Sequence, residues 1–169
     1  MKAFITRSAA LAIAAIFSAN ANATLWEFTS NLLGTNEVPP NGSPAAGMST
    51  GTYDDVTNMF MMDTVASGFT ANVTAAHIHN GPAGVAGPVV FPLSGTTGST
   101  SYTSHDMFNF SEAQEALFLA DNYYVNIHSV EFPGGEVRGQ LNPTVVPEPA
   151  TVLGLLVGTG LLLFARKRR

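Results

Sequence analysis

Residues 24–143 are predicted to fold as an all-β domain, either an antiparallel Greek-key-like β-sandwich or a barrel. Two features of the sequence predict this fold. Glycine, proline, asparagine, serine and threonine interrupt the chain about every 8–12 residues, which is the usual spacing of turns between short strands. Between these turns hydrophobic and polar residues alternate, as they do in strands with one buried face. The chain contains no cysteine, so the core must be stable without disulfide bonds.

Seven segments of this domain have the pattern expected of strands: residues 25–33, 49–54, 58–67, 72–79, 89–93, 123–128 and 136–141. Residues 111–118 are predicted to be a short helix, because Ser111 can cap its N-terminus and two glutamates lie in its first turn. Glycine and proline recur through residues 81–89 and predict a loop that follows the strand ending at His79.

The N-terminal 23 residues have the three parts of a secretory signal peptide. Lys2 and Arg7 provide the positive region, residues 9–17 are apolar, and Ala21-Asn22-Ala23 is an A-x-A cleavage site. We therefore expect cleavage after Ala23 and export of the remaining chain.

The C-terminus is predicted to enter a membrane. A linker, residues 144–149, contains Pro147-Glu148-Pro149 and is followed by the uncharged segment 150–165, which would form a helix of about 24 Å. The four basic residues 166–169 end the chain and should remain in the cytoplasm. This arrangement predicts a transmembrane helix in the inner membrane with the domain outside the cytoplasm.

Charge is distributed unevenly. Residues 24–149 contain all twelve acidic residues of the chain and one basic residue, Arg138, which gives this region a formal charge of −11. Such a surface repels phosphate backbones, so nucleic acid binding is not expected. The absence of cysteine also excludes thiol nucleophiles, iron–sulfur clusters and thiolate zinc sites.

The end of the chain resembles the PEP-CTERM sorting signal of Gram-negative bacteria. Val146-Pro147-Glu148-Pro149, the short apolar segment and the arginine-rich end occur in the order of that signal. The resemblance implies recognition by an exosortase, a membrane enzyme that processes such tails near the Pro-Glu-Pro motif. It also implies that the membrane helix is a temporary anchor before transfer to the cell surface or the extracellular biofilm and exopolysaccharide matrix.

The domain itself resembles the CHRD domain, first recognised in chordin. The resemblance is carried in order by residues 33–40, by Ala75-Ala76-His77-Ile78-His79-Asn80-Gly81, by residues 124–128 and by residues 133–141. It covers nearly all of 24–143 and implies a β-sandwich. It implies no particular chemistry.

Strand alternation predicts a polar group on the outer face of the sheet. Ile78 should face the core, so His77 and His79 should face outward together. If residues 123–128 and 136–141 form a hairpin, Ile127 lies opposite Val137, Asn126 opposite Arg138 and His128 opposite Glu136. The outward set is then His77, His79, His128, Glu136 and Arg138.

A His-x-His pair and a third histidine from another strand can bind copper or zinc, with Glu136 and Arg138 supporting the ligands. The His-x-His strand is similar to that of copper/zinc superoxide dismutases, although the cysteines of that family are missing and no zinc loop is evident. The structural interpretation is that the histidines bond the backbone of the 81–88 loop and that His128 pairs with Glu136.

The sequence therefore predicts an exported, membrane-tethered surface or matrix protein that is not an enzyme and has no catalytic residues or required cofactor. Its expected partners are an exosortase and either matrix polysaccharide or other surface proteins. The alternative is a copper- or zinc-binding or redox β-sandwich that uses His77, His79 and His128.

Overall fold

The computed structural model describes residues 23–147. The predicted signal peptide (except Ala23), Glu148 and Pro149, the predicted transmembrane helix 150–165 and the basic tail 166–169 lie outside the described residues. Between residues 23 and 147, no helix has the length and apolar character needed to cross a membrane.

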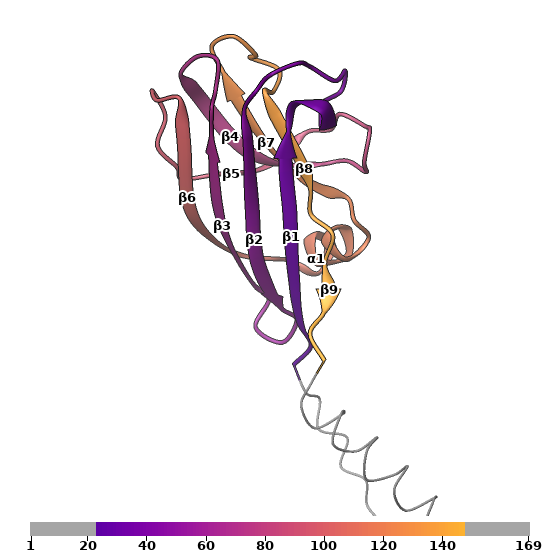
Figure 1. Cartoon of the computed structure of the whole chain (residues 1–169). Helices are drawn as coiled ribbons and strands as arrows, with labels where there is room; N and C mark the ends of the chain where they lie inside the picture. Colours follow the sequence, from indigo (N-terminus) through magenta and orange to yellow (C-terminus); the bar gives the residue numbers. More distant parts are fainter. Residues whose placement is uncertain (1–22, 148–169) are drawn as a thin grey trace, which may run out of the picture.

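The described residues form one curled antiparallel sheet (Figure 1). The hydrogen-bonded order is β5-β4-β7-β8-β1-β2-β3-β6, and β9 pairs with β1. The elements are β1 (Leu25–Leu33), η1 (Gly34–Asn36), β2 (Ala46–Asp54), β3 (Met59–Ser67), β4 (Val73–Asn80), β5 (Val89–Pro92), β6 (Ser101–Asn109), α1 (Glu112–Leu119), β7 (Tyr123–Ser129), β8 (Val137–Gln140) and β9 (Thr144–Val145).

The all-β antiparallel prediction is confirmed, but the division into two separate sheets is not. Leu33 of β1 pairs with Arg138 of β8, so the two halves of the predicted sandwich are joined at this point. The half formed by β1, β2, β3 and β6 lies in front of the half formed by β4, β5 and β7 in Figure 1. The apolar faces of both halves enclose a single core.

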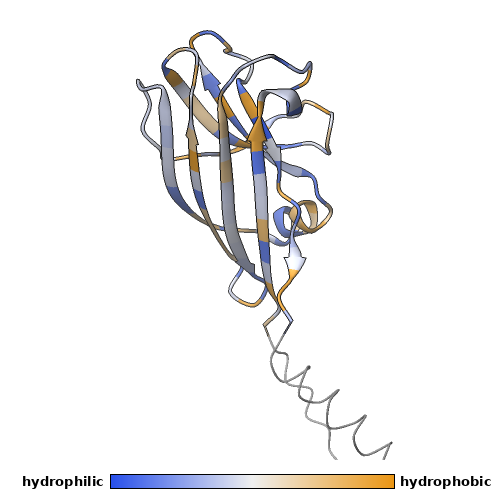
Figure 2. Ribbon diagram, in the orientation of Figure 1, coloured by the Kyte–Doolittle hydropathy of each residue, from blue (hydrophilic) through white to orange (hydrophobic). Residues whose placement is uncertain are grey.

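Hydrophobic and hydrophilic residues follow one another along the strands (Figure 2), and the alternating burial pattern places side chains on the inside or outside of the sheet. Along β1, Phe28, Ser30 and Leu32 are buried and the residues beside them are exposed. All nine residues of β1 pair with β2, and all nine of β2 pair with β3, without a shift of register. This continuity fixes the same inward face across three strands.

Aromatic side chains fill the core. Phe60 is fully buried and stacks on Phe28 and Phe110, at ring-centroid distances of 5.2 and 4.8 Å. Phe91 of β5 stacks on Phe108 of β6 at 4.5 Å, so aromatic contact connects the two edge strands of the curled sheet. Helix α1 contributes Phe118, whose ring meets that of Phe60 edge-on at 5.4 Å.

The predicted helix and its cap are confirmed. The Ser111 side chain accepts a hydrogen bond from the Gln114 backbone N–H, and the Gln114 side chain accepts one from the Ser111 N–H. This reciprocal pair is a capping box, which satisfies two N–H groups that the first turn leaves free.

Two strands were not predicted, β6 and β9. The inward face of β6 includes Ser104 and Asp106 as well as aromatic residues, so β6 lacks the apolar alternation of a half-buried strand. Asp106 is nevertheless buried, and it accepts a hydrogen bond from the Ser94 N–H. Strand β9 lies in the predicted linker 144–149 and pairs with Trp26 and Glu27, so the domain extends to Val145.

Candidate metal centre

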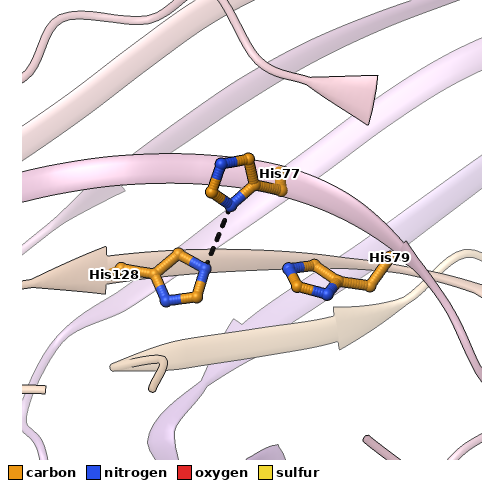
Figure 3. A group of neighbouring side chains, drawn as sticks. All are labelled: His77, His79 and His128. Atoms are coloured by element: carbon orange, nitrogen blue, oxygen red, sulfur yellow. Dashed lines mark hydrogen bonds between the residues drawn. The ribbon is translucent and has the colours of Figure 1, made fainter. Parts of the chain in front are cut away.

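Strands β4 and β7 bring His77, His79 and His128 together on one face of the sheet. In the β4–β7 pair, His128 lies opposite Ala75 and Asn126 lies opposite His77, so His128 is a diagonal neighbour of His77. His79 lies opposite Tyr124. Figure 3 shows the three imidazoles converging. One ligand nitrogen from each lies within 4.8 Å of the others, and the centroids of the three rings are 5.1–5.8 Å apart. Among residues 23–147 this is the group with metal-ligand spacing.

Backbone carbonyls set the tautomers of two of these rings. His79 Nδ1 lies 2.9 Å from the Gly87 carbonyl oxygen, and His128 Nδ1 lies 3.0 Å from the Pro133 carbonyl oxygen. A carbonyl only accepts, so both Nδ1 atoms carry hydrogen and both Nε2 atoms present a lone pair. His128 Nε2 faces His77 Nδ1 at 3.2 Å, whereas the buried His79 Nε2 has no hydrogen-bond partner among the described residues.

The environment keeps these imidazoles neutral. Burial lowers the pKa of His77, and the neighbouring His79 lowers it further. Burial also lowers the pKa of His79; the hydrogen bond to Gly87 opposes this shift, and the positive charge of Arg138 adds to it. Burial lowers the pKa of His128 to about 4, and the two other histidines add to this effect. At neutral pH all three rings are therefore unprotonated, the form in which imidazole binds metals.

The Gly/Pro loop between β4 and β5 supports His79 from behind. The Gly87 N–H donates to the Tyr124 hydroxyl at 3.0 Å while the Gly87 carbonyl accepts from His79. A side chain at Gly87 would collide with the carbonyl of Asn80, so glycine is required for this close approach. His79 Nδ1 thus bonds the backbone of the 81–88 loop, as the structural interpretation of the sequence expected. That interpretation does not explain why the buried Nε2 has no partner among the described residues.

Arg138 is separated from the histidine cluster by the ring of Tyr124. Its guanidinium carbon is 3.4 Å from the centroid of the Tyr124 ring, and this ring stacks on His79 with centroids 5.0 Å apart. Arg138 also donates to the Pro82 carbonyl at 3.0 Å. Arg138 thus contacts the cluster through Tyr124, an outward-facing aromatic residue that alternation placed on this face but that was not selected as a site residue.

Glu136 does not join the histidines, contrary to the sequence-based expectation. The hairpin register is as predicted for Asn126 with Arg138 and for Ile127 with Val137. However, β8 begins at Val137, so Glu136 precedes the paired residues and does not lie opposite His128. Its N–H donates to the Ile127 carbonyl, and its side chain is buried in the domain instead of lying on the outer face.

The fully buried Glu136 carboxylate instead connects two loops. Its Oε1 accepts from the Ser43 hydroxyl at 2.6 Å, and from the Thr70 N–H at 2.9 Å and hydroxyl at 3.0 Å. Burial acts to raise the pKa of Glu136, but hydrogen bonds from Ser129, Ser43 and Thr70 outweigh it and hold the pKa below its usual range. Glu136 is therefore a structural residue of the domain.

A second polar group lies beside Arg138 and was not selected from the sequence. Glu37 is 7% exposed, and its Oε1 has no hydrogen-bond partner in the described part of the chain. Burial raises the pKa of Glu37 to about 7, although Arg138 opposes the shift. Glu37 and Arg138 line a depression of about 590 Å³ together with Gln140 and the loop around Ala83. A carboxylate in a Pro-rich loop gives no sequence signal of burial, which explains why Glu37 was missed.

Comparisons with known proteins agree with both resemblances in the sequence. The family model for the CHRD domain matches residues 28–141, and the model for the PEP-CTERM protein-sorting motif matches residues 145–169. No curated protein and no solved structure was found to match the chain.

Proposed function

Because the chain belongs to the CHRD domain family and ends in a PEP-CTERM sorting motif, we propose that it is an exported surface protein that an exosortase-type enzyme processes. The observation that carries this proposal is the sorting-motif match at 145–169, which begins shortly after the domain match ends at residue 141. The proposed sequence of events is export, temporary retention in the inner membrane by the tail, and transfer to the cell surface or extracellular matrix.

The arrangement of the domain is compatible with such a tail. Val145 pairs with Trp26, and the Val146 N–H donates to the Leu25 carbonyl at 2.8 Å. The two ends of the described chain therefore lie side by side at one end of the domain, while β4 and β7 lie towards the opposite end (Figure 1). A domain held through its C-terminus would present the histidine-bearing strands away from the membrane. We propose a non-catalytic binding role there, with matrix polysaccharide or other surface proteins as partners.

Replacing Glu148 with glutamine is expected to keep the protein in the inner membrane of a host that contains an exosortase. The substitution preserves side-chain size but removes the charge from the Pro-Glu-Pro motif. The measurement is membrane fractionation and immunoblotting against the wild type. Glu131→Gln, in an exposed loop of the domain, is the matched control and should fractionate like the wild type. Identical fractionation of Glu148→Gln and the wild type would refute processing through this motif.

A second candidate function is binding of one copper or zinc ion by the domain. Three neutral imidazoles from adjacent strands, with ligand nitrogens within 4.8 Å of one another, favour this function. The two Nδ1–H groups that donate to backbone carbonyls provide the outer hydrogen bonds that usually orient histidine ligands. Arg138 and Tyr124 support His79 from the far side.

The full chain, purified in detergent with an affinity tag that contains no histidine, is expected to carry about one copper or zinc ion per molecule. Elemental analysis should find that the double variant His77→Ala/His79→Ala has lost at least about 90% of this metal, because two of three ligands are gone. His105→Ala is the control, since His105 lies on β6 and bonds Asp63 instead. Metal-free wild-type protein whose melting temperature is unchanged by added copper or zinc would refute this function.

A further inference from the structure

We infer that the three-histidine cluster is a copper(II) site with one coordination position open to a small ligand from solvent. This inference deepens the metal-binding function proposed above and rests on it. It makes two statements that metal binding alone does not require: the ion preferred is copper(II), and the protein does not complete its coordination.

The donor set excludes most other ions. The cluster comprises imidazoles only, without a carboxylate, and the chain has no thiolate to offer. Calcium and magnesium require oxygen ligands, so they do not fit. Neutral imidazoles suit first-row transition metals, and among these divalent copper binds most tightly to a given nitrogen site.

The number of ligands excludes a closed structural zinc site, whereas the preference for copper(II) over an open zinc site follows from its tighter binding to nitrogen ligands. Structural zinc sites are almost always closed by four protein ligands, whereas this cluster offers three. Copper(II) accepts a tetragonal arrangement in which solvent or a small anion completes the set. Three histidines on one face of two adjacent strands can occupy one side of such an arrangement.

The ligand nitrogens are already oriented for the ion. His79 Nε2 and His128 Nε2 both present lone pairs, because their Nδ1 hydrogens are bound to Gly87 and Pro133. His77 Nδ1 bonds His128 Nε2 and would have to transfer its hydrogen to Nε2, a change of tautomer without loss of a proton. His77 is only partly buried, so its ring can exchange that hydrogen with water.

The open position is on the side of Ala75. Ala75 lies directly opposite His128 in the β4–β7 pair, and its methyl group occupies little space over the sheet. Ala75, His77 and His128 are all partly exposed, whereas His79 is 8% exposed. Solvent therefore reaches the cluster from the Ala75 side, while Tyr124 and the Gly87 loop close the His79 side.

Two measurements on the full chain in detergent, carrying a histidine-free tag, test the inference. Competition titrations against a chelator should give one copper(II) per chain, bound about 100-fold more tightly than zinc(II). Azide added to the copper-loaded protein should change its electron paramagnetic resonance spectrum and produce an azide-to-copper absorption band. The azide-induced change in the resonance spectrum and the azide-to-copper absorption band should both be absent from His77→Ala/His79→Ala. Both should be retained in His105→Ala.

The outcomes distinguish the inference from the function on which it rests. Zinc bound as tightly as copper would overturn the copper assignment and leave metal binding intact. Copper bound stoichiometrically but insensitive to azide would overturn the open position. Absence of both metals from the folded wild type would refute metal binding itself. To separate a lost ligand from a lost fold, far-ultraviolet circular dichroism of the double variant must match that of the wild type.

Discussion

Replacing Phe60 with alanine is expected to lower the free energy of unfolding by about 3–5 kcal/mol, the usual cost of removing a buried aromatic side chain. Phe60 is fully buried and contacts four other aromatic rings, those of Phe28, Phe108, Phe110 and Phe118. Alanine would leave a cavity between the sheet and α1. Urea unfolding monitored by circular dichroism measures the change in the free energy of unfolding. In thermal unfolding, the melting temperature should fall by roughly 10–15 °C.

Met61→Ala is the matched control for this prediction. Met61 follows Phe60 on β3 but points to the outer face and is 40% exposed, so its loss should change the free energy of unfolding by less than about 1 kcal/mol. Phe60 also lies on the half of the sheet that carries none of the three histidines. A folded Phe60→Ala protein should therefore keep the metal stoichiometry of the wild type. Equal destabilisation by the two substitutions would contradict this view of the core.

Alternation of residues was sufficient to predict the parts of the fold in which each strand has one buried face. The sequence-based bounds of β1 agree with the structure because Phe28, Ser30 and Leu32 alternate with exposed residues without interruption. The same rule placed His77, His79 and His128 on one face, and the pairing of β4 with β7 then brought them into contact. Their proximity was predictable because it depends only on parity and on which strands are neighbours.

Alternation does not predict which side chains face the core where a residue lies outside the regular strand pairing or where the inward face of a strand is polar. Glu136 lies just before β8 and its side chain is buried in the domain, although its sequence position matches that of an outward residue. Strand β6 was missed because inward Asp106 is stabilised by the Ser94 N–H, a contact that only the tertiary structure supplies. Buried polar residues are thus the common cause of both errors, because their partners are distant in sequence.

Glu37 is a third such residue, and its burial opposes folding. The carboxylate lies near Arg138, yet within residues 23–147 no ion pair with atoms closer than 4.0 Å includes Glu37. Oε1 of Glu37 and Oδ1 of Asn126 both lack a hydrogen-bond partner there. Natural proteins usually satisfy such groups, so the buried Glu37 Oε1 near Arg138 is expected to reduce stability.

Replacing Glu37 with glutamine is therefore expected to stabilise the protein at pH 8 but not at pH 4.5. Burial raises the pKa of Glu37 from 4.5 to about 7 in the folded state. A raised carboxyl pKa leaves stability unaffected below pH 4.5, where the group is protonated in both states. Stability is then lost as pH rises from 4.5 to about 7, because the unfolded chain releases its proton over this range while the folded protein retains it. The variant lacks this loss, so its gain in unfolding free energy should be about 3 kcal/mol larger at pH 8 than at pH 4.5.

Urea unfolding of the wild type and Glu37→Gln across this pH range measures the difference. Glu131→Gln removes one exposed negative charge from a neighbouring loop and corrects for the change in net charge of the acidic domain. If the wild-type and Glu37→Gln curves run parallel between pH 4.5 and 8, Glu37 is not the group that titrates in the folded protein. If they diverge as expected and Glu131→Gln does not, Glu37 is the group that titrates, and burial of its carboxylate near Arg138 lowers the stability of the folded protein at pH 8.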